Sequence, residues 1–147
     1  MKRLVSLGVV LLVVLALISV LGVAGKLESW KVVQGGHGGL ALKITNTESG
    51  PLNYIEIYYW YGAGNFEVGS CIGFNSTAVK SIKNYKIGQT HWYGAKSVIE
   101  FEGKGVQPGG TLYCTLSKAG ATPGELEDLR KNAHEKLIHH IYGTQKR

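Results

Sequence analysis

Residues 52–61, with the sequence LNYIEIYYWY, form the stretch that decides the fold of this chain. Apolar and polar side chains alternate through it, and β-branched and aromatic residues dominate, which is typical of a β-strand with one buried face. The alternation turns three residues inward, Ile55, Ile57 and Tyr59. The opposite face then carries Tyr54, Glu56, Tyr58 and Trp60. We therefore expect this stretch to be the strongest strand of a β-rich protein.

Shorter runs on both sides of this stretch repeat the pattern. Residues 40–46 alternate cleanly, and residues 27–34, 66–74, 97–102 and 111–117 read as further strands, whereas residues 78–87 fit either a strand or a short helical turn. The 21 glycines, 8 tyrosines and 3 tryptophans favour strands joined by tight turns over a helical bundle. About seven short strands separated by turns predict a mainly β protein, an antiparallel β-sandwich of the immunoglobulin-like type, over residues 40–119.

Residues 26–39 are expected to form a lead-in strand followed by a glycine-rich hinge. The sequence GGHGG at residues 35–39 lacks the lysine and the strand-to-helix context of a phosphate-binding loop. A linker that lets the sandwich pivot relative to a membrane is the interpretation that we favour.

The N-terminal segment, residues 1–25, determines the expected compartment. Lys2 and Arg3 precede an uncharged, Leu/Val-dominated run that ends at Lys26. About 20 such residues cross a bilayer as a helix, so the run fits a retained anchor. Small residues near its end also fit a cleaved export signal, and both alternatives stay open. In either case we expect membrane contact through residues 4–24 and a β-domain outside the cytoplasm, at the cell membrane or cell surface.

Two further features agree with an external location. Asn75 opens the glycosylation sequon Asn-Ser-Thr, and Cys71 and Cys114 are an even pair of cysteines. We expect these cysteines to form a disulfide bond, with two buried free thiols as the alternative. The alternation of residues 66–74 sets Cys71 opposite to its apolar neighbours, which fits a bridge between two sheets poorly unless a bulge turns it.

The C-terminal segment, residues 122–143, is expected to be an amphipathic helix. Thr122, Pro123 and Glu125 are a typical helix start. Apolar residues then recur at helical spacing, at Leu126, Leu129, Ala133, Leu137 and Ile141.

The sequence offers no catalytic set, no metal site and no cofactor site. A zinc-protease helix needs histidines four residues apart, whereas His139 and His140 lie five and six residues beyond His134. Asp128 is the only aspartate, and no Gly-x-Ser-x-Gly elbow is present. Because no catalytic set is present, we expect no enzyme. The net charge of +6 comes from scattered residues, so we also expect no nucleic-acid partner.

Tyr54, Tyr58 and Trp60 are the candidate interaction surface. Outward aromatic rings can stack on sugars or contact another protein. The third alternative is that the C-terminal helix covers them within the same chain.

Residues 40–52 (LALKITNTESGPL) and 106–112 (VQPGGTL) are similar to the strand-turn signatures of archaeal cell-surface immunoglobulin-like domains. With the N-terminal apolar segment, the layout resembles an archaeal pilin or flagellin-type filament subunit. The resemblance implies apolar helices that bundle into a filament core and β-domains that form its outer sheath. It predicts a non-enzymatic structural subunit of a surface assembly, with protein partners through self-assembly. The alternatives are a single-span accessory subunit of a membrane protein complex and a carbohydrate-binding or adhesion module.

Overall fold

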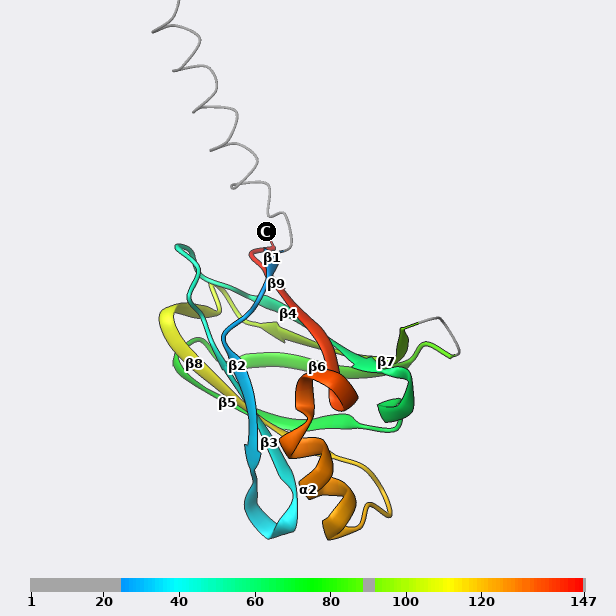
Figure 1. Cartoon of the computed structure of the whole chain (residues 1–147). Coiled ribbons are helices and arrows are strands. Elements are labelled where there is room, and N and C mark those ends of the chain that lie inside the picture. The colour runs from blue at the N-terminus through cyan, green and yellow to red at the C-terminus, as the bar shows by residue number, and fades with distance from the viewer. Residues whose placement is uncertain (1–24, 89–91, 147) are drawn as a thin grey trace, which may run out of the picture.

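The computed structural model of the chain describes residues 25–88 and 92–146, so the predicted anchor or signal lies outside the described residues except for Gly25. Two antiparallel sheets face each other (Figure 1). The five-stranded sheet runs in the order β1 (Gly25–Lys26), β9 (Ile138–Thr144), β4 (Tyr54–Trp60), β7 (Tyr93–Phe101) and β6 (Val79–Lys86). The four-stranded sheet runs in the order β2 (Trp30–Gln34), β3 (Leu40–Thr45), β8 (Val106–Ser117) and β5 (Glu67–Ser76). The expected mainly β sandwich is confirmed.

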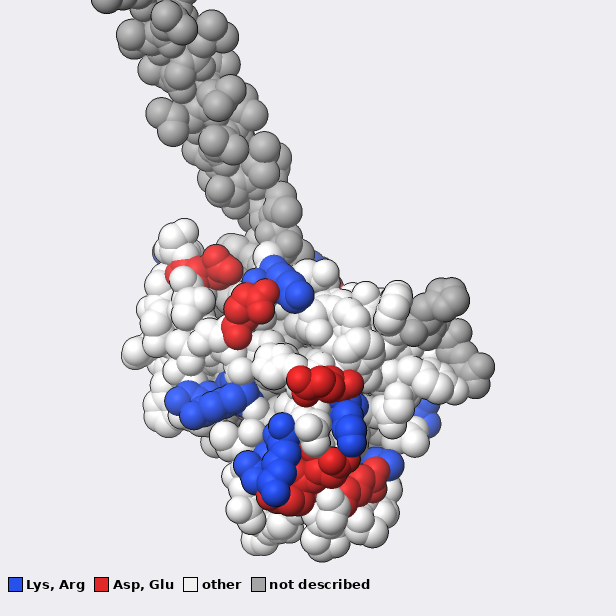
Figure 2. Space-filling view, in the orientation of Figure 1, with Lys and Arg blue, Asp and Glu red and all other residues white. Residues whose placement is uncertain are grey.

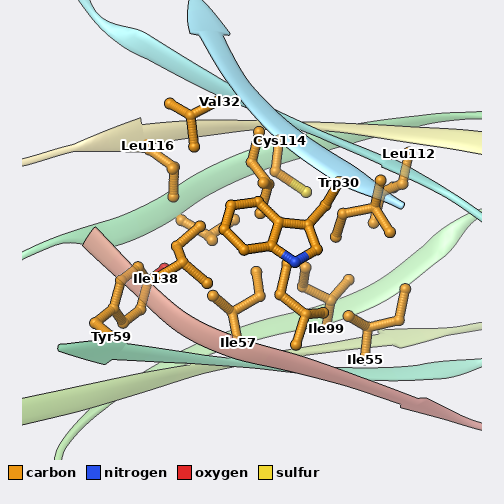
Figure 3. Close-up of a cluster of buried hydrophobic side chains, with 14 of the residues drawn as sticks. Trp30, Val32, Ile55, Ile57, Tyr59, Ile99, Leu112, Cys114, Leu116 and Ile138 are labelled. Carbon is orange, nitrogen blue, oxygen red and sulfur yellow. The ribbon is translucent and has the colours of Figure 1, made fainter. Parts of the chain in front are cut away.

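The stretch at residues 52–61 supplies β4, the central strand of the five-stranded sheet. Its inward residues Ile55, Ile57 and Tyr59 are at most 1% exposed, as the alternation predicts. They meet Leu42, Leu112 and other residues of the opposite sheet in one continuous apolar core (Figure 3). Burial of these side chains, at roughly 1.5–3 kcal/mol each, is the main stabilisation that holds the sheets together.

Residues 78–87 resolve the ambiguity in favour of a strand, β6. This strand and β5 are the edges of the two different sheets, and Asn84 joins them. Its Oδ1 accepts from the amide of Val68, and its Nδ2 donates to the carbonyl of Val68, both at 3.0 Å. One amide side chain therefore makes the pair of bonds that a neighbouring strand would make with β5.

The glycine-rich stretch is a hairpin turn, and the expectation of a hinge is wrong. Residues Gly36–Gly38 form a short 3₁₀ turn, η1, that joins β2 to β3, and Gly35 donates to the carbonyl of Gly39 at 2.8 Å. Gly38 has φ +75°, a conformation that glycine adopts more readily than residues with a β-carbon. The sandwich thus begins before residue 40, since β2 pairs with β3 along its whole length.

The C-terminal segment is a helix only in its first part, and the expectation of a helix to residue 143 is wrong. Helix α2 spans Pro123–Lys131, and Thr122 caps it by accepting from the Glu125 amide at 3.1 Å, as expected. A π-helical turn, η3 (Ala133–Leu137), follows, and the chain then enters the sheet as β9. β9 lies between β1 and β4, so the C-terminus is an internal part of the sandwich.

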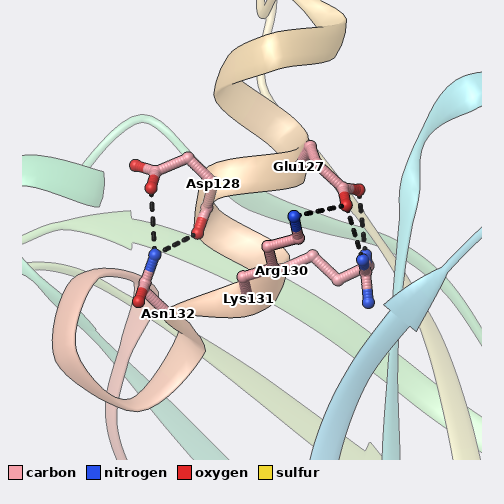
Figure 4. Close-up of polar contacts among 5 residues, drawn as sticks. All are labelled: Glu127, Asp128, Arg130, Lys131 and Asn132. Carbon is pink, nitrogen blue, oxygen red and sulfur yellow. Dashed lines mark hydrogen bonds and ion pairs between the residues drawn. The ribbon is translucent and has the colours of Figure 1, made fainter.

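The solvent side of α2 is highly charged, as the helix pattern predicts. Glu127 forms ion pairs with Arg130 at 2.6 Å and Lys131 at 3.5 Å, and Asn132 donates to Asp128 (Figure 4). Figure 2 shows these charges gathered at the end of the molecule where α2 lies. In the described part of the chain, no helix combines the length and apolar character that crossing a bilayer requires.

The predicted disulfide between Cys71 and Cys114 is present. The two residues are direct partners on β5 and β8 of the same sheet, so the bridge does not join the two sheets. A register shift between Val68 and Cys71 turns Cys71 toward its partner, which resolves the conflict in the alternation. β8 begins at Val106, five residues before the strand expected at residues 111–117.

Candidate binding face

The outer face of the five-stranded sheet collects aromatic rings from four strands and one adjoining loop. β4 contributes Tyr54, Tyr58 and Trp60, which are half-buried and lie on one side of the strand, with Glu56 between Tyr54 and Tyr58. The register of the sheet sets Tyr58 beside His140 of β9, and Trp60 beside Tyr93 of β7. We call the whole set the aromatic face, and it consists of Tyr54, Tyr58, Trp60, Tyr85, Trp92, Tyr93, His139, His140 and Tyr142.

Tyr58 is the centre of the aromatic face. Its ring stacks on His140, with ring centroids 4.5 Å apart and planes 29° apart. The rings of Tyr93 and Tyr142 lie 5.1 and 6.0 Å away, and the Tyr58 hydroxyl donates to the Glu56 carboxylate. Contacts on several sides hold the Tyr58 ring in a fixed orientation, so it forms a preorganised platform.

A second cluster forms where β4 ends and η2 (Tyr61–Ala63) begins. Trp60 contacts His139 at 4.2 Å and Trp92 at 6.4 Å between ring centroids. Its Nε1 donates to the carbonyl of His134 in η3 at 2.7 Å, which fixes the indole. Trp92 is 57% exposed and is the most exposed ring of the face.

The surroundings favour the uncharged forms of four side chains of the face, Tyr54, Tyr58, His139 and His140. Burial raises the pKa of Tyr54 to about 12, and the negative charge of Glu56 adds to this effect. Burial also raises the pKa of Tyr58. Burial, together with the charges of His139 and Lys26, lowers the pKa of His140 to about 4, and burial also lowers that of His139. The two imidazoles therefore share a neutral Nδ1–Nδ1 hydrogen bond of 2.6 Å. Because these imidazoles are neutral, the positive charges next to the rings belong to lysine side chains.

Charged side chains lie between the rings. The Nζ of Lys96 is 6.0 Å from the Tyr58 ring and 5.5 Å from the Tyr85 ring, and the Nζ of Lys146 is 3.7 Å from the Tyr54 ring. A hollow of about 420 Å³ adjoins Tyr54 and is lined in part by Lys80, Glu100 and Lys146. The face therefore offers apolar rings and hydrogen-bonding groups side by side.

The aromatic face exposes almost no aliphatic surface. Val98 of β7 faces outward in register with Glu56, yet only 5% of it is exposed because its neighbours cover it. Two large apolar residues of the face are exposed, Tyr85 of β6 and Trp92 of the adjoining loop, and both carry a polar group on the ring. This composition differs from the apolar centre of a typical protein interface, where charges are depleted.

The prediction that Tyr54, Tyr58 and Trp60 share one face is confirmed, whereas cover by the C-terminal helix is wrong. The apolar side of the C-terminal segment packs into the core between the sheets, through Leu129, Ala133 and Leu137. The three aromatic residues of β4 therefore stay half-exposed. The other rings of the face escaped sequence reasoning because their strand order was unknown. The available signal was the abundance of tyrosine and tryptophan.

The three histidines near the C-terminus have different surroundings. The His134 ring packs on Trp30 with centroids 4.0 Å apart, while His139 and His140 belong to β9 and not to a helix. Among the described residues, no group of three or more histidine, cysteine, aspartate or glutamate side chains could hold a metal ion. Asn75 is exposed near the end of β5, on the other sheet.

Fold and face together define a two-sheet antiparallel β-sandwich with an open aromatic surface. No family model and no curated protein matches the sequence. Among solved structures, the chain is similar to the family 3a carbohydrate-binding module from the scaffolding protein of Clostridium thermocellum, with 16% identity, a TM-score of 0.40 and coverage of 65% of this chain and 76% of that one. It is also similar to a cohesin module from a family 33 glycoside hydrolase of Clostridium perfringens, with 9% identity, a TM-score of 0.38 and coverage of 67% and 75%.

Proposed function

We propose that this chain is a non-catalytic binding module outside the cytoplasm, and that its aromatic face binds an extended carbohydrate. The observation that carries the proposal is the row of Tyr54, Tyr58 and Trp60 on β4, with polar and charged groups between the rings. The Cys71–Cys114 disulfide supports an oxidising compartment.

A sugar ring has an apolar face of C–H groups and a rim of hydroxyls. A flat aromatic ring matches the first, and carboxylates, ammonium groups and phenols match the second. Alternate residues of a strand are about 7 Å apart, so Tyr58 and Trp60 are one such step apart and Tyr54 is two steps from Tyr58, with the Glu56 carboxylate between them. The surface is open and not an enclosed pocket, which suits a polymer better than a single small molecule.

Binding of the full-length protein to insoluble and soluble polysaccharides tests the proposal. Suitable ligands are cellulose, chitin, xylan and the surface polysaccharide of the host cell. We expect Trp92→Ala and Tyr58→Ala each to weaken binding about 3- to 10-fold, because a ring contact contributes about 0.5–1.5 kcal/mol. Tyr113→Ala on the opposite sheet is the matched control and should bind as the unmodified chain does.

Failure has a clear form. If no polysaccharide binds, or if Tyr113→Ala weakens binding as much as Trp92→Ala, the carbohydrate proposal is wrong. Co-purification of a protein partner that depends on Trp92 would replace it with a protein contact. The resemblance to a pilin-like filament subunit stays a prediction.

A further inference from the structure

A second surface lies on the outer face of the four-stranded sheet, opposite to the aromatic face. Ile72 and Phe74 of β5 are 68% and 60% exposed, and Tyr113 of β8 is 36% exposed. Ile72 is the register partner of Tyr113, and the Phe74 and Tyr113 rings meet edge to face at 5.8 Å. We call these three residues the apolar patch. It adjoins a sheet edge, where uncovered apolar surface favours aggregation.

Asn75 directly follows Phe74 and belongs to the only Asn-x-Ser/Thr sequon of the sequence. Its side chain is exposed, and it forms no hydrogen bond with any residue that the structure describes. The backbone of Asn75 has φ +53°, at a register shift between Phe74 and Ser76. Asparagine tolerates this conformation better than most residues, and the shift ends regular alternation there.

We infer that Asn75 carries an N-linked glycan whose innermost sugars lie on Phe74 and Tyr113 and cover the apolar patch. The donor is an oligosaccharide linked to a lipid phosphate. A bond forms between the anomeric carbon of the sugar and Nδ2 of Asn75, while the bond from that carbon to the phosphate oxygen breaks. The amide nitrogen loses one proton, and the lipid phosphate leaves with the bonding electrons.

The timing of this transfer follows from Thr77, the third residue of the sequon. In the folded chain, its hydroxyl donates to the carbonyl of Glu102 and accepts from the amide of Gly105 at 3.0 Å. The hydroxyl is therefore engaged once the turn between β7 and β8 has closed against the turn between β5 and β6. The glycan must be added before this closure, while the chain is still extended.

Peptide mass analysis of the protein isolated from its own host tests the modification. We expect the peptide that contains Asn75 to carry a hexose-rich mass, and Asn75→Asp to abolish it. Aspartate also tolerates positive φ, so this variant removes the acceptor without introducing a bulky or β-branched side chain. Thr77→Ser, which keeps the sequon, is the matched control and should stay modified. An unmodified Asn75 in native protein would overturn the inference.

A second measurement tests the cover. Asn75→Asp should bind more of an apolar fluorescent dye and self-associate at lower concentration than the glycosylated chain. Adding Phe74→Ser and Ile72→Thr should reverse both changes. Equal dye binding with and without the glycan would refute its packing on the patch, and a protein that co-purifies through Phe74 would assign the patch to a protein contact. These outcomes are independent of polysaccharide binding on the other sheet.

Discussion

Ser97 places a hydroxyl in the apolar core, fully buried on β7. Its Oγ donates to Oδ1 of Asn84 at 2.5 Å and lies 2.8 Å from the Tyr59 hydroxyl. Because the single proton of Ser97 goes to Asn84, the Tyr59 hydroxyl must donate to Ser97. Burial raises the pKa of Tyr59, so the phenol keeps that proton. A chain of bonds thus runs from the core to the contact between β6 and β5.

This chain predicts unequal effects of two conservative substitutions. Ser97→Ala leaves the buried Tyr59 hydroxyl without a partner and should lower the free energy of unfolding by about 2 kcal/mol. Tyr59→Phe leaves Ser97 bonded to Asn84 and should cost about 1 kcal/mol. The double variant should be no less stable than Ser97→Ala alone, since no phenol is then left unpaired. Urea unfolding measures the stability of the two single variants and the double variant. Strictly additive losses would contradict the assigned direction of the hydrogen bonds from Tyr59 to Ser97 and from Ser97 to Asn84.

At the scale of elements, the prediction was good where a strand alternates regularly and poor where a bulge interrupts it. β3 and β4 follow the pattern of their sequences because every second residue points into the core. In β9, the register shifts between Ile138 and His140, so both Ile138 and Ile141 point inward although they are three residues apart. Residues on one face of a helix have the same spacing. A prediction from periodicity alone therefore extended the C-terminal helix to residue 143, through the residues that form β9. The β-branched and aromatic residues of β9 were the signal for a strand.

The placement of β9 predicts which C-terminal residues stabilise the protein. Ile141 is fully buried on an internal strand, so Ile141→Ala should lower the free energy of unfolding by about 3 kcal/mol. Leu126 of α2 is only partly buried, and Leu126→Ala should cost about 1 kcal/mol. Denaturant unfolding measures both variants. The comparison is matched because leucine and isoleucine are isomers, so each substitution removes the same atoms. Equal losses would mean that β9 contributes no more than an attached helix does.

At the scale of the whole molecule, local pattern predicts the layers but not the order of the strands. Inward residues such as Leu42 and Ile57 could be named from alternation, and the sandwich follows from them. The aromatic face could not, since it depends on β9, β4, β7 and β6 lying side by side. Long-range pairing sets that order, and among the described strands the last, β9, pairs with the first, β1. The rings of His140 and Tyr58 meet only as a result of this insertion.

The disulfide acts at this largest scale. Cys71 and Cys114 are 43 residues apart in sequence, and the loop between them contains β6 and β7 of the opposite sheet. Closing such a loop restricts the unfolded chain, which the chain-entropy model values at about 4 kcal/mol. We therefore expect Cys71→Ala/Cys114→Ala to lower the free energy of unfolding by about this amount, a large share of the total for one domain. Guanidinium unfolding of the unmodified chain with and without reductant should show the same loss, whereas the double variant should be insensitive to reductant. An unchanged midpoint after complete reduction, verified by thiol labelling, would show that strand pairing alone holds β5 to β8.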